Sequence, residues 1–82
     1  MENKEFGRQL EIRTKKFAIS IFKLSSALFD TIEYKVIKYQ LTKSGSSIGA
    51  NYREANRSRS KADFRNKIKI CESEASETVY WL

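Results

Sequence analysis

Basic residues gather in the second half of the sequence, where they could bind the phosphates of a polyanion. Seven of them and only two acidic residues fall between Arg53 and Lys69, a net charge of +5. Lysine and arginine neutralise phosphates and release counterions, so such a cluster can hold RNA or DNA without reading its sequence. A solvated helix face that contacts nothing is the alternative. The candidate nucleic-acid-binding residues are Arg53, Arg57, Arg59, Lys61, Arg65, Lys67 and Lys69, with Lys15, Lys16, Lys35 and Lys38 as residues that could widen the patch.

Polar residues, either uncharged or acidic, recur at helical spacing in the segment that precedes and overlaps this basic cluster. Ser47, Asn51 and Glu54 follow one another at steps of four and three, so they share one side of a helix. They could contact nucleic acid or a partner. A hydrogen-bonded network between packed helices is favoured, because a buried polar group is costly unless it is paired. Gln40 and Ser44 extend this predicted structural polar network.

The sequence lacks the residue sets that catalysis or metal binding would need. It contains no histidine and one cysteine, Cys71, which removes most metal sites and the imidazole base that nucleophiles usually require. Glu74 and Glu77 could be read as an acid and base pair, but no nucleophile accompanies them. We therefore expect no enzymatic activity, no cofactor and no metal, with Cys71 as a small core residue.

The elements that position these residues are expected to be helices. The 82 residues include no proline and only three glycines, a composition typical of an all-α protein with a single domain over residues 1–82. No apolar stretch approaches the roughly 20 residues that cross a bilayer, and the N-terminus lacks an apolar signal segment. With a lone cysteine as well, these features predict a cytoplasmic protein without a membrane partner.

Apolar spacing predicts a first helix over about residues 5–28. Large apolar residues recur there at steps of three, four or seven, as on the side of a helix that faces other helices. Asp30 or Thr31 is expected to cap the next helix. The predicted core positions of the first helix are Phe6, Leu10, Phe17, Ile21, Leu24 and Leu28.

The second helix is predicted from Ile32 to Ala55, although small residues interrupt its middle. The segment from Lys43 to Ser47 looks like a linker on its own, but the apolar spacing passes through it unbroken. Small side chains let another backbone approach closely, so a tight helix crossing is expected there.

The third helix should start at Ser60 or Lys61, behind a capping box, and place Phe64, Ile68, Cys71, Ala75, Thr78 and Leu82 in the core.

One combined pattern resembles a known family. It reads Gln40-Leu41-x-Lys43-Ser44-x-x-Ser47-Ile48-x-Ala50-Asn51-x-x-Glu54-Ala55, then Ser60-x-x-Asp63-Phe64, then Glu74-Ala75-x-Glu77-x-x-Tyr80-Trp81-Leu82. This pattern is similar to that of the four-helix-bundle family of 23S rRNA intervening-sequence proteins, over nearly the whole chain from about Leu10. The resemblance implies an antiparallel up-down four-helix bundle that associates into a homopentamer. It also implies a relation to accessory proteins of diversity-generating retroelements, which share this bundle.

The resemblance and the residues together predict a truncated bundle and two alternative functions. The chain ends where the family continues into a fourth helix, so three helices of a four-helix bundle are expected, with the truncation on the C-terminal side. The first function is a non-catalytic oligomeric bundle that associates with rRNA or other RNA or DNA through its basic surface. The alternative is a structural or adaptor module for a protein such as a reverse transcriptase or a ribosome-associated factor. In a ring of subunits, Glu72, Glu74 and Glu77 could meet the basic run of a neighbour.

Overall fold

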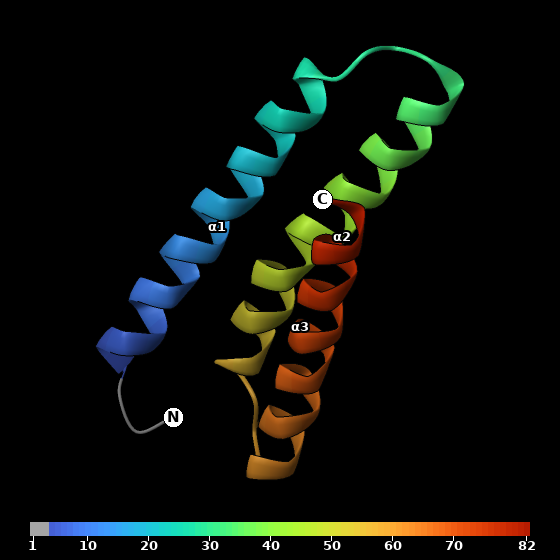
Figure 1. Cartoon of the computed structure of the whole chain (residues 1–82). Coiled ribbons are helices and arrows are strands. Elements are labelled where there is room, and N and C mark those ends of the chain that lie inside the picture. The colour runs from blue at the N-terminus through green and yellow to red at the C-terminus, as the bar shows by residue number, and fades with distance from the viewer. Residues whose placement is uncertain (1–3) are drawn as a thin grey trace.

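The computed structural model describes residues 4–82 as three α-helices joined by short connections (Figure 1). Helix α1 spans Lys4–Ala27, α2 spans Ile32–Ala55 and α3 spans Lys61–Trp81. No strand occurs in this part of the chain. The predicted all-α fold is confirmed, and the helix ends lie within one residue of those expected from the sequence. None of the three helices is long and apolar enough to cross a membrane.

Two local sequence signals start α2 and α3. The Thr31 side chain accepts a hydrogen bond from the Tyr34 backbone N–H over 3.2 Å, and Ser60 does the same for Asp63 over 3.0 Å. Each cap satisfies one of the backbone donors that a helix start leaves unpaired. Asp63 also places a negative charge in the first turn of α3, where the helix dipole favours it.

Helix α2 lies at the centre of the fold, and the other two helices run antiparallel to it (Figure 1). Both α1 and α3 pack on α2, whereas within residues 4–82 they do not pack on each other. The arrangement is therefore an open layer rather than a closed bundle, with overall dimensions of 45 × 21 × 15 Å.

The contact between α1 and α2 depends on two glycines. A Cβ atom at Gly45 would lie 3.0 Å from Cγ1 of Ile21, and one at Gly49 would lie 2.9 Å from Oγ1 of Thr14. Both distances are shorter than ordinary van der Waals contact, so only glycine lets α1 approach α2 this closely. The small residues in the middle of α2 thus form a continuous helix with a tight crossing, as the apolar spacing predicted.

Several core positions predicted for α1 are wrong. Of the six, only Ile21 is buried, while Phe6, Phe17 and Leu24 are 62%, 39% and 42% exposed. The side of α1 that touches α2 is instead centred on Gly7 and Ile21. The apolar stripe is centred roughly a sixth of a turn away from it around the helix axis. The stripe residues share a face, but only its edge at Ile21 lies against α2.

The core predicted for α3 is confirmed at Cys71 and Thr78, which are buried against α2. The Cys71 Sγ donates a hydrogen bond to the Ile48 carbonyl over 3.5 Å. Leu82, by contrast, is exposed, and its placement in the core is wrong. Its position one residue beyond α3 takes it out of the helix that packs on α2.

Candidate nucleic-acid interface

A groove of about 540 Å³ runs between α1 and α2. Ser46 and Ala50 on its α2 side lie roughly half a turn from Ser44, the residue that faces α3. The groove therefore opens on the face of α2 turned away from α3. Its lining residues are Arg8, Glu11, Ile12, Thr14, Lys15 and Ala18 from α1 and Ser46, Gly49, Ala50 and Arg53 from α2.

The floor of this groove is hollow because its residues are short. Gly49 adds no side chain to the floor, and a Cβ atom there would collide with Thr14. The side chains of Ala18, Ser46 and Ala50 extend only a short way into the groove. The close crossing of the two helices and the groove beside it therefore have the same origin in the sequence. Ile12 adds the one large apolar side chain, half of whose surface is exposed.

Three cationic side chains surround the floor. Arg8 and Lys15 are seven residues apart, so they project from the same side of α1 two turns from each other, and Arg53 faces them from α2. All three are exposed. The rim is thus strongly basic and suited to an anionic ligand.

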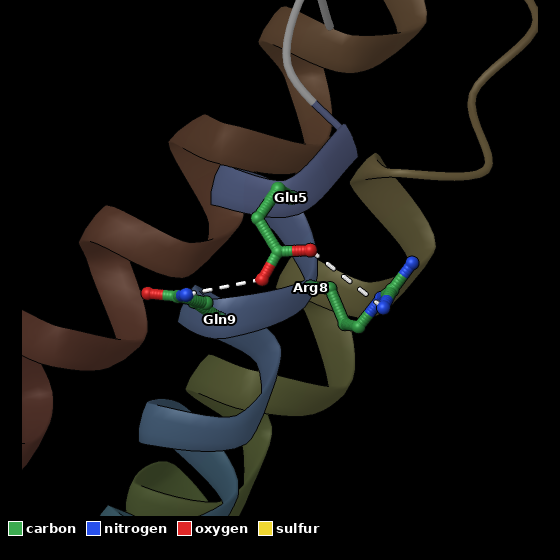
Figure 2. Close-up of polar contacts among 3 residues, drawn as sticks. All are labelled: Glu5, Arg8 and Gln9. Atoms are coloured by element: carbon green, nitrogen blue, oxygen red, sulfur yellow. Dashed lines mark hydrogen bonds and ion pairs between the residues drawn. The ribbon is translucent and has the colours of Figure 1, made fainter.

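Arg8 forms an ion pair with an exposed carboxylate at the edge of the groove (Figure 2). Its Nη1 lies 3.6 Å from Oε1 of Glu5, whose other oxygen accepts a hydrogen bond from Nε2 of Gln9 over 3.0 Å. Such an exposed pair contributes only about 0.2–1 kcal/mol. Arg8 can therefore exchange this carboxylate for a phosphate at little cost.

Glu11 brings a carboxylate into the groove itself. Its Oε2 accepts a hydrogen bond from Nδ2 of Asn56 over 2.8 Å, and the same Nδ2 lies 3.3 Å from the Gly7 carbonyl oxygen. These contacts tie the start of α1 to the end of α2. They also engage the Glu11 carboxylate with the side-chain amide of Asn56.

The structure does not gather the seven predicted basic residues into one pocket. Arg53 lines the groove, Arg57 and Arg59 lie in the connection between α2 and α3, and the other four belong to α3. Within residues 4–82, none of the seven forms an ion pair with a carboxylate. They therefore stay available to an external anion.

Arg8 lines the groove but was not among the predicted site residues, and Lys15 was predicted only as an extension of the basic patch. Their spacing of seven residues was a usable signal that they share a helix face. Nothing in the sequence placed that face beside Arg53, which is 45 residues away from Arg8 along the chain.

The predicted polar network is built largely from contacts within α2. Ser47 Oγ donates to the Lys43 carbonyl over 2.7 Å, and Asn51 Nδ2 donates to the Ser47 carbonyl over 2.8 Å. Glu54 is exposed. These three residues therefore satisfy themselves along their own helix or in solvent.

Ser44 supplies the link from this group to another helix. Its Oγ donates to the Gln40 carbonyl over 2.8 Å and lies 2.9 Å from the Thr78 hydroxyl on α3. Thr78 was expected to be a core residue rather than a polar partner. Among the residues of the predicted polar network, the hydrogen bond to another helix is therefore this one pair of hydroxyls.

The chain is similar to known proteins of one family. The family of 23S rRNA-intervening sequence proteins matches residues 4–82. This chain belongs to that family. A crystal structure of a protein with unknown function, from the S23 ribosomal protein family of Bacteroides thetaiotaomicron, superposes with a TM-score of 0.80. The two chains are 42% identical, and the match covers 92% of this chain and 67% of the other. No curated protein matches the chain.

Neither description names a reaction. Within residues 4–82, no group of three histidine, cysteine, aspartate or glutamate side chains could hold a metal ion. Burial raises the pKa of the Cys71 thiol, an effect that a backbone hydrogen bond partly opposes. A buried thiol with a raised pKa is a poor nucleophile.

Proposed function

We propose that this intervening-sequence protein is a non-catalytic module that associates with RNA or DNA through phosphate contacts. One observation carries the proposal. Within residues 4–82, the seven basic residues from Arg53 to Lys69 have no carboxylate partner, and the groove adds Arg8 and Lys15 on the neighbouring helix. The family description, which refers to 23S rRNA, supports RNA as the first polyanion to test.

The chemistry of such a module is electrostatic. Each lysine or arginine that contacts a phosphate releases condensed counterions, so affinity comes from the number of contacts and falls with salt. Phosphate contacts fix position but carry no sequence information. The protein would therefore hold a backbone without selecting bases, in the cytoplasm where ribosomal RNA resides.

Self-association is the second part of the proposal. The open layer leaves apolar side chains of α1 exposed, among them Phe17 and Leu24, and a short chain gains stability by covering such a surface. The family resemblance suggests five copies. Repetition of a basic surface around an oligomer would raise the affinity of individually weak contacts.

A protein adaptor is the competing function, and one patch favours it. Phe29, Ile32, Val36 and Tyr39 are exposed at the connection of α1 and α2 and along the first turns of α2. Ile32, Val36 and Tyr39 follow steps of four and three, which place them on one helix face. A reverse transcriptase or a ribosome-associated factor could dock there.

Charge reversal at the corner between α2 and α3 tests the nucleic-acid function. A labelled structured RNA is titrated at about 50 mM salt, where several phosphate contacts give strong binding. We expect Arg57→Glu combined with Arg59→Glu to abolish binding. Lys23→Glu combined with Lys43→Glu is the control, because it makes the same charge change at exposed sites farther from that corner. Equal losses in both variants would show a general charge effect and contradict a defined surface.

A further inference from the structure

We propose that the groove between α1 and α2 binds an unpaired nucleotide of a single strand. Its phosphate would lie on the basic rim of Arg8, Lys15 and Arg53, and its base over the apolar floor. The inference rests on the proposed function and adds the form of nucleic acid that the protein prefers.

The dimensions of the groove fit one nucleotide. Its volume of about 540 Å³ lies within the roughly 300–1,000 Å³ of small-ligand sites. Two packed helices have axes only about 8–10 Å apart, so the space above their crossing is narrow. A base inside a duplex is paired and stacked, and bringing it into such a groove would require unstacking at a cost of a few kcal/mol. A single strand can present its base without this cost.

The charges of the groove select an anion. Three exposed cations line it from both helices, and its one carboxylate, on Glu11, is engaged by Asn56 at 2.8 Å. A phosphate among Arg8, Lys15 and Arg53 would gain charge-assisted hydrogen bonds. The flat guanidinium groups of the two arginines could also stack on a base.

The floor is suited to the face of a base rather than to its edge. Ile12, Ala18 and Ala50 offer apolar contact, and among the residues that the structure describes no aromatic side chain lines the groove. Apolar contact with a base face depends little on which base is present. The site should therefore accept different nucleotides, in keeping with binding through the backbone.

Filling the groove without changing its charge tests the inference. A labelled 12-nucleotide single strand and the same strand annealed to its complement are titrated at about 50 mM salt. Ala50→Leu places a larger side chain over the floor, at a position where the existing residue is exposed. Ala62→Leu is the matched control, because Ala62 is an exposed alanine of α3 that does not line the groove. Thermal unfolding followed by circular dichroism checks that each variant folds.

We expect the wild type to bind the single strand roughly tenfold more tightly than the duplex, which corresponds to about 1.4 kcal/mol. Ala50→Leu should remove this preference, whereas Ala62→Leu should retain it. Lys15→Gln is a second variant that does not enlarge any side chain, and it should weaken single-strand binding more than duplex binding.

Three results would overturn the inference without overturning the proposed function, and a fourth would overturn both. Equal affinity for single strand and duplex, or full binding by Ala50→Leu, would leave nucleic-acid association at the corner of Arg57 and Arg59 but exclude the groove. A labelled poly-glutamate peptide is titrated in the same way. If it binds the wild type as tightly as the single strand does, and Ala50→Leu loses this binding, the groove is a site for an acidic polypeptide. Absence of binding to every polynucleotide would end both proposals.

Discussion

The hydroxyl groups of Thr78 and Ser44 meet across 2.9 Å between α3 and α2, where the two residues are only 1% and 2% exposed. Each hydroxyl also lies 2.8 Å from the carbonyl four residues earlier in its own helix. The pair thus lies in an interface that excludes water, with every polar atom satisfied. A shift of α3 along α2 would leave both hydroxyls buried without each other, so the pair fixes the register of the two helices.

Removal of the Thr78 hydroxyl should destabilise the fold moderately. Thr78→Val keeps the shape of the side chain but deletes the donor, and we expect the free energy of unfolding to fall by about 1 kcal/mol. Urea denaturation followed by circular dichroism measures the change. In a double-mutant cycle with Ser44→Ala, the two effects should couple by about 0.5–1 kcal/mol. Strict additivity would mean that the two hydroxyls do not interact.

The crossing of α1 and α2 should reject even the smallest side chain at Gly49. Alanine normally favours a helix over glycine by about 1 kcal/mol. At this position its Cβ would lie 2.9 Å from Thr14 Oγ1 and 3.4 Å from the Thr14 backbone carbon. We therefore expect Gly49→Ala to lower the free energy of unfolding by about 1–3 kcal/mol.

Thr14→Ala removes the nearest atom and should restore part of the stability that Gly49→Ala loses. Ser76→Ala, on the exposed side of α3, is the control that reports helix propensity without a close contact. A Gly49→Ala protein more stable than the wild type in thermal unfolding would contradict the close approach.

The Cys71 thiol should make the fold sensitive to high pH. Because burial raises its pKa in the folded protein, the unfolded chain loses the thiol proton first as pH rises. The stability due to the buried neutral thiol is complete below the ordinary pKa of about 8.5 and declines above it. Lysines and tyrosines also titrate in this range, so the useful quantity is the difference between wild type and Cys71→Ala.

That difference in unfolding free energy, measured by urea denaturation from neutral pH upward, should shrink as pH rises past the ordinary thiol pKa. A difference that stays constant with pH would show that the thiol ionises equally in both states. Thiol reagents give a second readout, since they should modify Cys71 rapidly only in denaturant.

Release of Arg8 from its carboxylate partner should strengthen nucleic-acid binding. Glu5→Gln removes the charge 3.6 Å from the Arg8 guanidinium. We expect affinity for a single strand to rise roughly 1.4- to fivefold at low salt, the effect of an exposed pair worth about 0.2–1 kcal/mol. Glu72→Gln on α3 makes the same change in net charge outside the groove. Matching gains in the two variants, measured by anisotropy, would argue against a role for Arg8.

Much of the fold could be predicted because its signals are local. Thr31 and Ser60 act on backbone donors three residues away, so their sequence context was enough to place the starts of two helices. The continuity of α2 through its small residues also followed from spacing within a single helix. These features need no knowledge of what lies across from them.

Features set by packing between helices could not be predicted in the same way. The spacing of Phe6, Phe17 and Leu24 shows that they share a face, but not that α2 would pack on the neighbouring side of the helix. The groove brings together Arg8 and Arg53, whose meeting depends on the antiparallel path of α1 and α2. Likewise, the partner of Ser44 is Thr78, 34 residues away on α3.

The salt dependence of RNA binding tests the central claim most directly. Anisotropy titrations of a labelled RNA between about 50 and 200 mM salt give the slope of log affinity against log salt. A surface of several free cations predicts a steep negative slope, and loss of one phosphate contact should reduce its magnitude by about 1. A shallow slope would contradict a phosphate-binding surface. Absence of binding at the lowest salt would do so as well, and would point to the exposed apolar patch around Ile32 as the working surface.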